Sequence, residues 1–295
     1  MLSILIPTYN FNVIDFVTDL SQQAKTCGID FEILCFDDSS DEEFKLKNQS
    51  LKKFTNVTYI ELPQNIGRSK IRNLLATEAK FEYLLFLDCD SKTNSSQFIA
   101  NYLKHAKPNT VVYGGRNYES KPPKEKNLFF RWWYGINRET ISVAERERNP
   151  YHSFMTNNFL IPKTLFLSIQ LDEKLVGYGH EDTLFGIELK KKNIVIHHIN
   201  NPLCHIGLES VDEYLQKTKE GIKNLHQLIN SGKVDKTVKL YRFYNLAKKV
   251  GLETKLLSYY NKNKNKLEEK FKKDKPNLKW FDLYKLGYLI SLTKS

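Results

Sequence analysis

Two acidic side chains directly follow an apolar run, at a position that suits metal chemistry. The run spans residues 83–87, and Asp88-Cys89-Asp90 comes next. A short continuous apolar run is typical of a strand buried on both faces, and open α/β sheets bind ligands at the carboxyl ends of their strands. Neighbouring carboxylates repel each other, and Mg²⁺ or Mn²⁺ would relieve that repulsion. Such a pair is equally typical of an ordinary surface turn, because Asp is a common turn residue.

A second acidic pair follows two glycines in Gly177-Tyr178-Gly179-His180-Glu181-Asp182. The glycines allow close approach of the backbone, and a helix is expected over residues 183–192. Carboxylates at a helix N-terminus are stabilised by the helix dipole, so the pair has two interpretations. It caps the helix, or it supplies a positioned carboxylate that takes a proton from a hydroxyl nucleophile.

The flanking sequence predicts the elements that position these groups. Strands are expected at residues 2–6, 31–36, 57–62, 83–87 and 111–113, and helices at 13–27, 42–54, 68–79 and 98–106. Alternating strands and helices indicate a parallel, wound α/β sheet. The polar segments 7–10, 37–41 and 88–90 each follow a strand, so we expect them to line one crevice at one edge of the sheet.

Taken together, these motifs resemble the family 2 glycosyltransferases, which have the Rossmann-like GT-A fold. The resemblance covers roughly residues 1–210. It rests on Ile4-Leu5-Ile6-Pro7-Thr8-Tyr9-Asn10, Asp37-Asp38-Ser39-Ser40-Asp41, Asn65-Ile66-Gly67, Arg72-Asn73, Asp88-Cys89-Asp90 and the G-x-G-x-E-D stretch at 177–182. It implies transfer of a sugar from a nucleotide donor, most often a UDP-sugar, with inversion at the anomeric carbon.

The resemblance also implies roles for individual residues, all of which are expectations at this point. Asp182 would be the general base, with Glu181, Tyr178 and His180 on the acceptor side. Asp90 and His205 would bind Mn²⁺ or Mg²⁺, and Asn157 or Asn158 would contact the donor sugar. The nucleotide would lie against Pro7, Thr8, Tyr9, Asp38, Arg68 and Asp88, with Asp38 at the base and Asp88 near the ribose. Arg68 opens a helix, so either its charge or the helix N-terminus would face the diphosphate; the alternative is an ordinary exposed arginine. Arg72 is expected to be structural.

Charge is distributed unevenly along the 295 residues. The formal net charge is +11, yet residues 1–209 hold 25 basic and 25 acidic side chains, whereas residues 210–295 hold 20 basic and 9 acidic ones. We therefore expect a GT-A domain over 1–209 and a basic helical region over 210–295, with helices near 210–230, 236–250, 252–272 and 278–292. Such asymmetry indicates an anionic partner surface. No nucleic-acid motif accompanies the charge.

Two segments keep open alternatives. The last helix is either an appendage packed on the catalytic body or an interfacial helix that places Trp280, Phe281 and Tyr284 on an anionic membrane. The aromatic stretch 129–134 is either a partly buried helix or part of an acceptor loop, since aromatic rings suit sugar faces.

The cysteines and the N-terminal residues bear on compartment. The four cysteines form no C-x-x-C pair, which favours a reducing compartment over a disulfide framework. Residues 1–7 are expected to be a strand and not a signal peptide, and no stretch has the roughly 18 apolar residues of a membrane span. We therefore expect a cytoplasmic protein, either free or peripheral on the inner face of the cell membrane.

The sequence thus predicts a metal-dependent inverting glycosyltransferase that acts on a glycan or lipid-linked saccharide. One alternative is a sugar nucleotidyltransferase, which would need a glycine-rich loop after the first strand, where the sequence has Pro7-Thr8-Tyr9-Asn10. Another is a non-catalytic protein that binds sugars or a membrane surface. The presence of Asp90, Asp182 and His205 argues against that alternative.

Overall fold

The computed structural model describes residues 1–175, 177–273 and 275–294, and it contains two compact units. The first unit comprises residues 1–119, 140–174 and 181–207. The second comprises residues 120–139, 175–180 and 208–295, so it takes in two segments from inside the range expected for the GT-A domain. No helix in the described ranges is long and apolar enough to cross a membrane.

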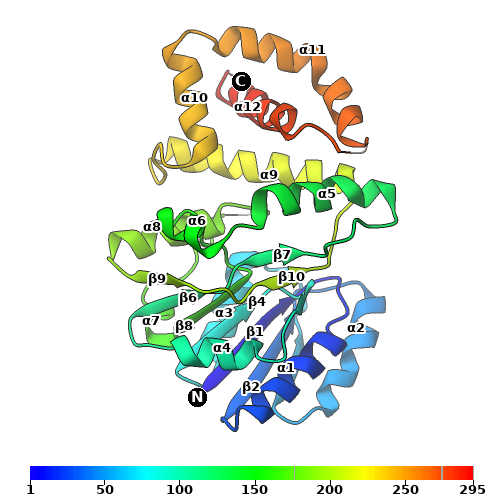
Figure 1. Cartoon of the computed structure of the whole chain (residues 1–295), viewed down its shortest axis with the longest axis vertical. Coiled ribbons are helices and arrows are strands. Elements are labelled where there is room, and N and C mark those ends of the chain that lie inside the picture. The colour runs from blue at the N-terminus through cyan, green and yellow to red at the C-terminus, as the bar shows by residue number, and fades with distance from the viewer. Residues whose placement is uncertain (176, 274, 295) are drawn as a thin grey trace. The chain divides into compact units, whose positions relative to one another are not determined.

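A seven-stranded sheet forms the centre of the first unit (Figure 1), in the order β3-β2-β1-β4-β8-β6-β9. The strands are β1 (Leu2–Thr8), β2 (Phe31–Asp37), β3 (Val57–Glu61), β4 (Tyr83–Leu87), β6 (Thr110–Tyr113), β8 (Asn158–Pro162) and β9 (Val195–His198). Only β8 runs against its neighbours β4 and β6. The start of β8 therefore lies at the same sheet edge as the carboxyl ends of β1, β2 and β4.

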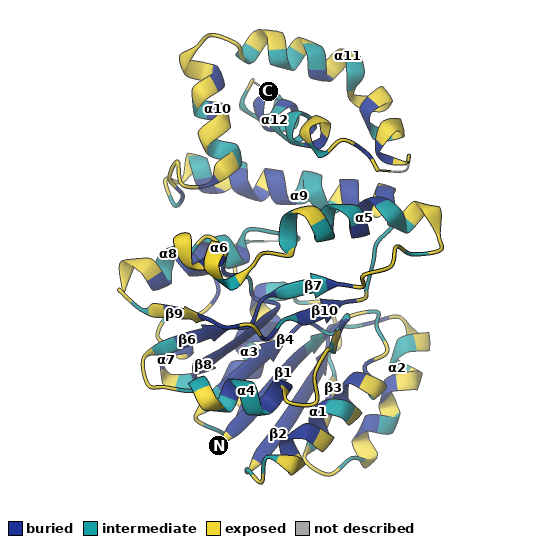
Figure 2. Ribbon diagram, viewed as in Figure 1, coloured by how far each residue is buried: buried dark blue, intermediate teal, exposed yellow. Residues whose placement is uncertain are grey.

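Helices cover both faces of this sheet, which explains the continuous apolar strands. Successive side chains of β1 belong to different clusters: Ile4 and Ile6 pack in one core, and Leu5 packs in the other. Figure 2 shows the inner strands as almost wholly buried, whereas the edge strands β3 and β9 alternate with exposed residues. The helices and 3-10 turn of this unit are α1 (Ile14–Thr26), α2 (Glu42–Asn48), η1 (Gln49–Lys53), α3 (Arg68–Glu78), α4 (Phe98–His105), α6 (Val143–Arg148), α7 (Lys163–Leu167) and α8 (Glu181–Lys191). The helix expected over 42–54 is thus an α-helix followed by a 3-10 turn.

A small second sheet completes the first unit and brings distant segments together. It has the order β5-β10-β7, formed by β5 (Ser91–Thr93), β7 (Arg116–Tyr118) and β10 (Leu203–His205). The antiparallel pairing of β5 with β10 places His205 opposite Ser91. The residue that precedes Ser91 is Asp90, so this sheet aligns the two expected metal ligands.

The second unit is helical and has an aromatic core. Its elements are η2 (Lys126–Leu128), α5 (Phe129–Tyr134), the π-helix η3 (Gly135–Glu139), α9 (Val211–Asn230), α10 (Lys239–Lys249), α11 (Glu253–Phe271) and α12 (Leu278–Lys294). Phe130 of α5 stacks on Phe271 with ring centroids 5.1 Å apart and meets Phe281 edge-on at 5.0 Å. The aromatic stretch 129–134 therefore serves packing in this unit.

The structure corrects the expected lipid-facing residues of the last helix. Phe281 and Tyr284 are at most 1% exposed and lie in the aromatic core, so they have no surface to offer to a membrane. Trp280 is 38% exposed and stacks on Tyr259 at 6.1 Å. The sequence pattern misled because a helix that is apolar nearly all round suits a protein core and a lipid interface alike.

Candidate active site

Asp90 and His205 form a close pair of potential metal ligands. Asp90 Oδ1 and His205 Nδ1 lie 3.3 Å apart. The pairing is fixed by the backbone, because the carbonyl of Asp90 accepts hydrogen bonds from the N–H groups of Ile206 and Gly207 at 2.9 and 3.1 Å. A Cβ atom at position 207 would lie only 2.5 Å from Asp90 Cβ. Glycine at this position therefore makes the approach of Asp90 possible.

These two side chains fit one divalent cation. Adjacent ligands of an octahedral ion with bonds of 2.0–2.1 Å are about 3 Å apart, which is close to the observed separation. Asp90 Oδ1 is buried and has no hydrogen-bond partner among the described residues. Arg116 Nη2 lies 3.4 Å from His205 Nδ1, so a bound cation would replace that contact.

The charges around Asp90 favour its ionised form. Burial alone would raise the pKa of this carboxyl, but the charges of His205, Arg116 and Arg68 hold the pKa well below its ordinary value. Within the described ranges no cluster of three or more His, Cys, Asp or Glu side chains is placed to hold a metal. Two protein ligands would leave the other positions of a cation to phosphate oxygens or water.

Asp88, in contrast, is balanced by arginines. Its carboxylate lies 2.5 Å from Arg72 Nη2, 3.4 Å from Arg116 Nη2 and 4.0 Å from Arg68 Nη2. Arg72 is only 2% exposed and Asp88 9%, which makes this a buried charge cluster whose members must stay paired. The repulsion between two acidic groups that we expected after β4 is therefore relieved at Asp88 by protein cations.

Arg68 joins the two acidic motifs across the sheet edge. Its Nε donates to Glu181 Oε1 at 2.7 Å, while its guanidinium also approaches Asp88. Glu181 is 6% exposed. Burial would raise its pKa, but Arg68 and Arg72 lower it below the ordinary range. The sequence assigned Arg68 to a diphosphate and Glu181 to an acceptor, whereas the structure pairs the two side chains with each other.

Asp182 has a very different environment from its neighbour. It lies in the first turn of α8, which begins at Glu181, two residues earlier than expected. Burial and the negative charge of Glu181 raise the pKa of Asp182 to about 7, despite a hydrogen bond from the Thr183 N–H to Oδ1 at 2.6 Å. A carboxylate with a pKa near the working pH is well suited to take a proton from a hydroxyl group.

The glycines before this pair belong to the second unit and have structural reasons there. Gly179 has φ +93°, and a Cβ atom on it would lie 3.1 Å from the Cα of Gly221 in α9. Asn224 Nδ2 donates to the carbonyls of Tyr178 and Gly179, both at 3.2 Å. Tyr178 and His180, expected on the acceptor side, are both partly exposed.

The residues expected around the nucleotide base divide into two groups. Tyr9 is 52% exposed and Pro7 is half-buried, so both have surface available. Thr8 is fully buried and its hydroxyl donates to the Ile6 carbonyl at 3.2 Å, so its side chain presents no surface to a nucleotide. Both carboxylate oxygens of Asp38 accept backbone N–H groups, from Ile66 at 2.7 Å and Gly67 at 3.0 Å. Asp38 thus holds the loop before α3.

The adjacent asparagines have separate roles. Asn158 is fully buried and its amide is engaged on both sides: Tyr102 donates to Oδ1 at 2.5 Å, and Nδ2 donates to the carbonyls of Gly115 and Asn201. Its side chain therefore has neither exposed surface nor a free polar atom to present to a sugar. Asn157 lies beside Asp88, whose N–H donates to the Asn157 carbonyl at 2.9 Å. Its Nδ2 has no hydrogen-bond partner in the described part of the chain.

Sequence reasoning missed two residues of this site. Arg116 contacts both Asp88 and His205, but no expected site motif includes it. The only feature of the sequence that pointed to Arg116 is its position directly after Gly114-Gly115, at the end of an expected strand. Gly207, which lets Asp90 approach, gave only the weaker signal of a glycine two residues beyond His205.

A protein-family model and several individual proteins match this chain in sequence. The model of Glycosyl transferase family 2 matches residues 3–166. Poly(ribitol-phosphate) beta-glucosyltransferase of Bacillus spizizenii is 36% identical over 209 residues, covering 66% of this chain and 30% of that protein. Chondroitin synthase of Escherichia coli is 22% identical over 238 residues, covering 69% and 34%. The chain thus spans about a third of the length of these relatives.

Solved structures support the fold. The mannosyltransferase PcManGT from Pyrobaculum calidifontis, in complex with GDP-Man and Mn²⁺, matches with a TM-score of 0.54 and 12% identity, over 78% of this chain and 64% of that one. S. aureus TarS 1–349, in complex with UDP-GlcNAc, matches with a TM-score of 0.52 and 15% identity, over 99% and 91%. The expected GT-A fold and the family resemblance are therefore confirmed, and the chain belongs to the family 2 glycosyltransferases.

Proposed function

We propose that this chain transfers a sugar from a UDP-sugar to a carbohydrate or polyol-phosphate polymer, with a divalent cation bound by Asp90 and His205 and with Asp182 as the base. The observation that carries the proposal is that two carboxylates of this site have pKa values shifted in opposite directions. One carboxylate, Asp90, is held ionised beside a histidine. The other, Asp182, has its pKa raised to about 7.

The donor class follows from two lines of support. TarS was solved with UDP-GlcNAc and PcManGT with GDP-Man, so proteins of this fold take nucleotide-sugars. Sequence similarity favours the poly(ribitol-phosphate) beta-glucosyltransferase at 36% identity. We therefore place a UDP-sugar first among donors and a GDP-sugar second.

Asp90 and His205 are proposed to hold the cation against the diphosphate. Bound there, a divalent cation would offset the negative charge that develops on the leaving diphosphate. Asp88 stays with its three arginines and keeps Arg68, Arg72 and Arg116 at the same edge, where they add positive potential. This arrangement needs no third acidic ligand from the protein.

The proposed reaction is a direct displacement. The acceptor hydroxyl oxygen forms a bond to the anomeric carbon while the bond from that carbon to the diphosphate oxygen breaks, and the hydroxyl proton passes to Asp182. A hydroxyl group is a poor nucleophile unless a placed base removes its proton as the bond forms. Inversion at the anomeric carbon follows from a single displacement.

A nucleotide-release assay tests the proposal. UDP-glucose, UDP-GlcNAc and GDP-mannose are incubated with the protein and Mn²⁺, with and without a poly(ribitol-phosphate) or glycosaminoglycan acceptor. We expect one UDP-sugar to release UDP faster when acceptor is present. UTP formation from UDP-sugar and pyrophosphate would instead identify a nucleotidyltransferase, and binding without release of any nucleotide would identify a non-catalytic protein.

Calorimetry tests the cation separately. UDP is titrated into the wild-type protein and into the Asp90→Asn and His205→Ala variants, each with Mn²⁺ and with EDTA. We expect Mn²⁺ to strengthen UDP binding only in the wild type. Equal affinity of the wild type in Mn²⁺ and in EDTA would remove the metal from the proposal and leave the rest of the site to be judged by the release assay.

A further inference from the structure

Helix α10 in the second unit exposes an apolar stripe. Phe243, Leu246 and the C-cap residue Val250 are 44%, 54% and 55% exposed, and their spacing of three and four residues puts them on one side of the helix. The adjoining face packs inward through Tyr244 and Ala247, which are at most 9% exposed. Folded proteins seldom leave contiguous apolar surface in water unless it binds something.

Cations line the same helix. Its residues Lys239–Lys249 include Lys239, Arg242, Lys248 and Lys249 and contain no acidic side chain. All four are exposed. Arg242 and Lys249 are seven residues apart, so they form a second stripe beside the apolar one. Across the ranges that the structure describes, none of these cations is paired with an Asp or Glu side chain.

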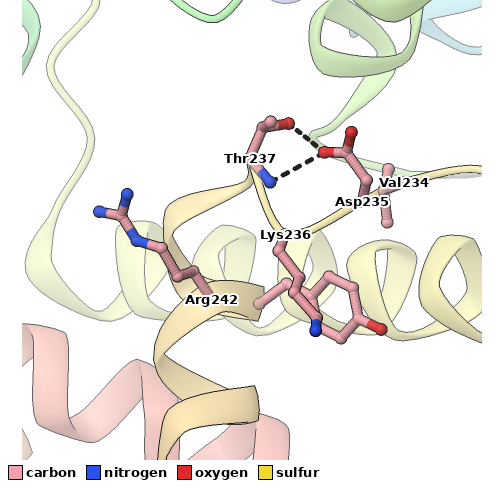
Figure 3. A pocket seen from close by; sticks show the side chains of 6 residues that line it. Val234, Asp235, Lys236, Thr237 and Arg242 are labelled. Atoms are coloured by element: carbon pink, nitrogen blue, oxygen red, sulfur yellow. Dashed lines mark hydrogen bonds between the residues drawn. The ribbon is translucent and has the colours of Figure 1, made fainter.

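A pocket at the start of α10 does not provide a compact anion site. It has a volume of about 520 Å³ and is lined by residues 234–237, Tyr241 and Arg242. Figure 3 shows the charged ends of Lys236 and Arg242 pointing away from each other. The Asp235 carboxylate accepts hydrogen bonds from the N–H and the hydroxyl of Thr237. Charges spread in this way suit an extended anionic surface better than one bound phosphate.

We propose that α10 binds the surface of an anionic lipid membrane, with Phe243, Leu246 and Val250 in the interface and Arg242 and Lys249 at the headgroups. A helix with an apolar face and a Lys/Arg-rich flank binds in this manner, and anionic lipids attract basic segments close to the surface. A second copy of the chain is a poorer partner. A two-fold pairing through this face would oppose the unpaired cations of both copies.

The proposed lipid contact thus lies on α10 and not on α12, where the sequence suggested it. The excess of positive charge in residues 210–295 remains its electrostatic basis. Membrane binding by α10 is independent of the proposed sugar transfer, because the experiment below measures only the partition of the protein between water and vesicles.

Vesicle flotation of the full chain tests the proposal. Phosphatidylcholine vesicles with and without phosphatidylglycerol are compared at low salt and at about 1 M salt. At the higher salt concentration the Debye length is only about 3 Å, so attraction between exposed charges is largely screened. The test variant is Phe243→Ser/Leu246→Ser. The matched control is Leu46→Ser/Ile60→Ser, which removes apolar side chains that are 61% and 42% exposed on the first unit. All four substitutions are at the surface, and thermal melting verifies that each variant folds.

We expect wild type and control to float with phosphatidylglycerol vesicles at low salt and to be released at high salt. The test variant should partition at least about tenfold more weakly, as expected for loss of two large side chains from an interface. Arg242→Gln/Lys249→Gln should also weaken binding. Flotation of the test variant equal to that of the control would overturn the proposal. The proposal would also be overturned if the wild-type protein does not float with these vesicles and instead forms dimers that the Phe243→Ser/Leu246→Ser substitutions dissociate.

Discussion

Replacing Glu181 by Gln should move the pH dependence of catalysis, because Glu181 raises the pKa of Asp182. A base with a pKa of about 7 is only about 1% ionised at pH 5, so turnover should climb about tenfold per pH unit below neutrality. An ordinary aspartate, with a pKa of 3.8, would be almost fully ionised at pH 5 and would give a flat profile there.

The size of the shift follows from electrostatics. Neighbouring charges act on a pKa at about 4–6 Å, and at an effective dielectric constant of about 20 a unit charge at about 6 Å contributes about 2.8 kcal/mol, or about two pH units. Asp182 is partly exposed, and screening reduces this to about one unit. Both effects of the substitution lower the pKa of Asp182. A negative charge that raises it is lost, and Arg68, which lowers it, no longer has its charge offset by Glu181.

The assay is kcat/KM for sugar transfer measured from pH 5 to pH 9. Wild type should show a midpoint near 7, and Glu181→Gln a midpoint about one unit lower. Glu188→Gln is the matched control, since Glu188 lies on the same helix and pairs with Lys191 at 2.7 Å. A midpoint that stays in place in Glu181→Gln, or that moves equally in Glu188→Gln, would refute the electrostatic reasoning.

Predictions for four further variants concern positioning and stability. Gly207→Ala should weaken the Mn²⁺-dependent part of UDP binding in calorimetry while leaving binding in EDTA unchanged, because the new Cβ would push Asp90 aside. Asn158→Ala should destabilise the protein by about 2–4 kcal/mol in denaturant unfolding, since buried partners lose their hydrogen bonds. Asn157→Ala should instead lower transfer with a smaller loss of stability, because Asn157 is also buried but its side chain has only a weak hydrogen bond from Tyr113 at 3.4 Å; equal loss of stability in both variants would contradict the assignment. Asp182→Asn should raise the melting temperature at pH 8 but not at pH 4. Its pKa is raised in the folded state, so ionisation opposes folding as pH rises from the ordinary pKa toward 7, and an unchanged melting temperature at pH 8 would indicate an ordinary pKa.

Local patterns in the sequence predicted most of the first unit. The apolar run 83–87 is β4, with the bounds expected, because a strand buried on both faces leaves an uninterrupted apolar signature. The polar segments that follow β1, β2 and β4 lie at the same edge because parallel strands end together. Strand alternation also explains why Thr8 is buried: β1 continues through that residue, so its side chain points inward.

Contacts between distant segments could not be predicted in this way. Nothing local to Arg68 indicates that its guanidinium pairs with Glu181 rather than with a ligand, and Arg116 meets His205 only through the pairing of β7 with β10. Asn157 and Asn158 are neighbours of the same type, and only the register of β8 against β4 separates their roles. Phe281 and Tyr284 are core residues because α5, α9 and α11 cover them, which composition does not reveal.

The most direct test of the proposed mechanism is the rate of sugar transfer by Asp182→Asn, measured together with its affinity for UDP. The substitution is nearly isosteric and leaves Asp90, His205 and the arginines in place. We predict unchanged UDP affinity and a kcat lower by roughly 10²–10⁴-fold, the range of general acid–base catalysis. Turnover within about threefold of wild type, far short of that range, would mean that another group deprotonates the acceptor.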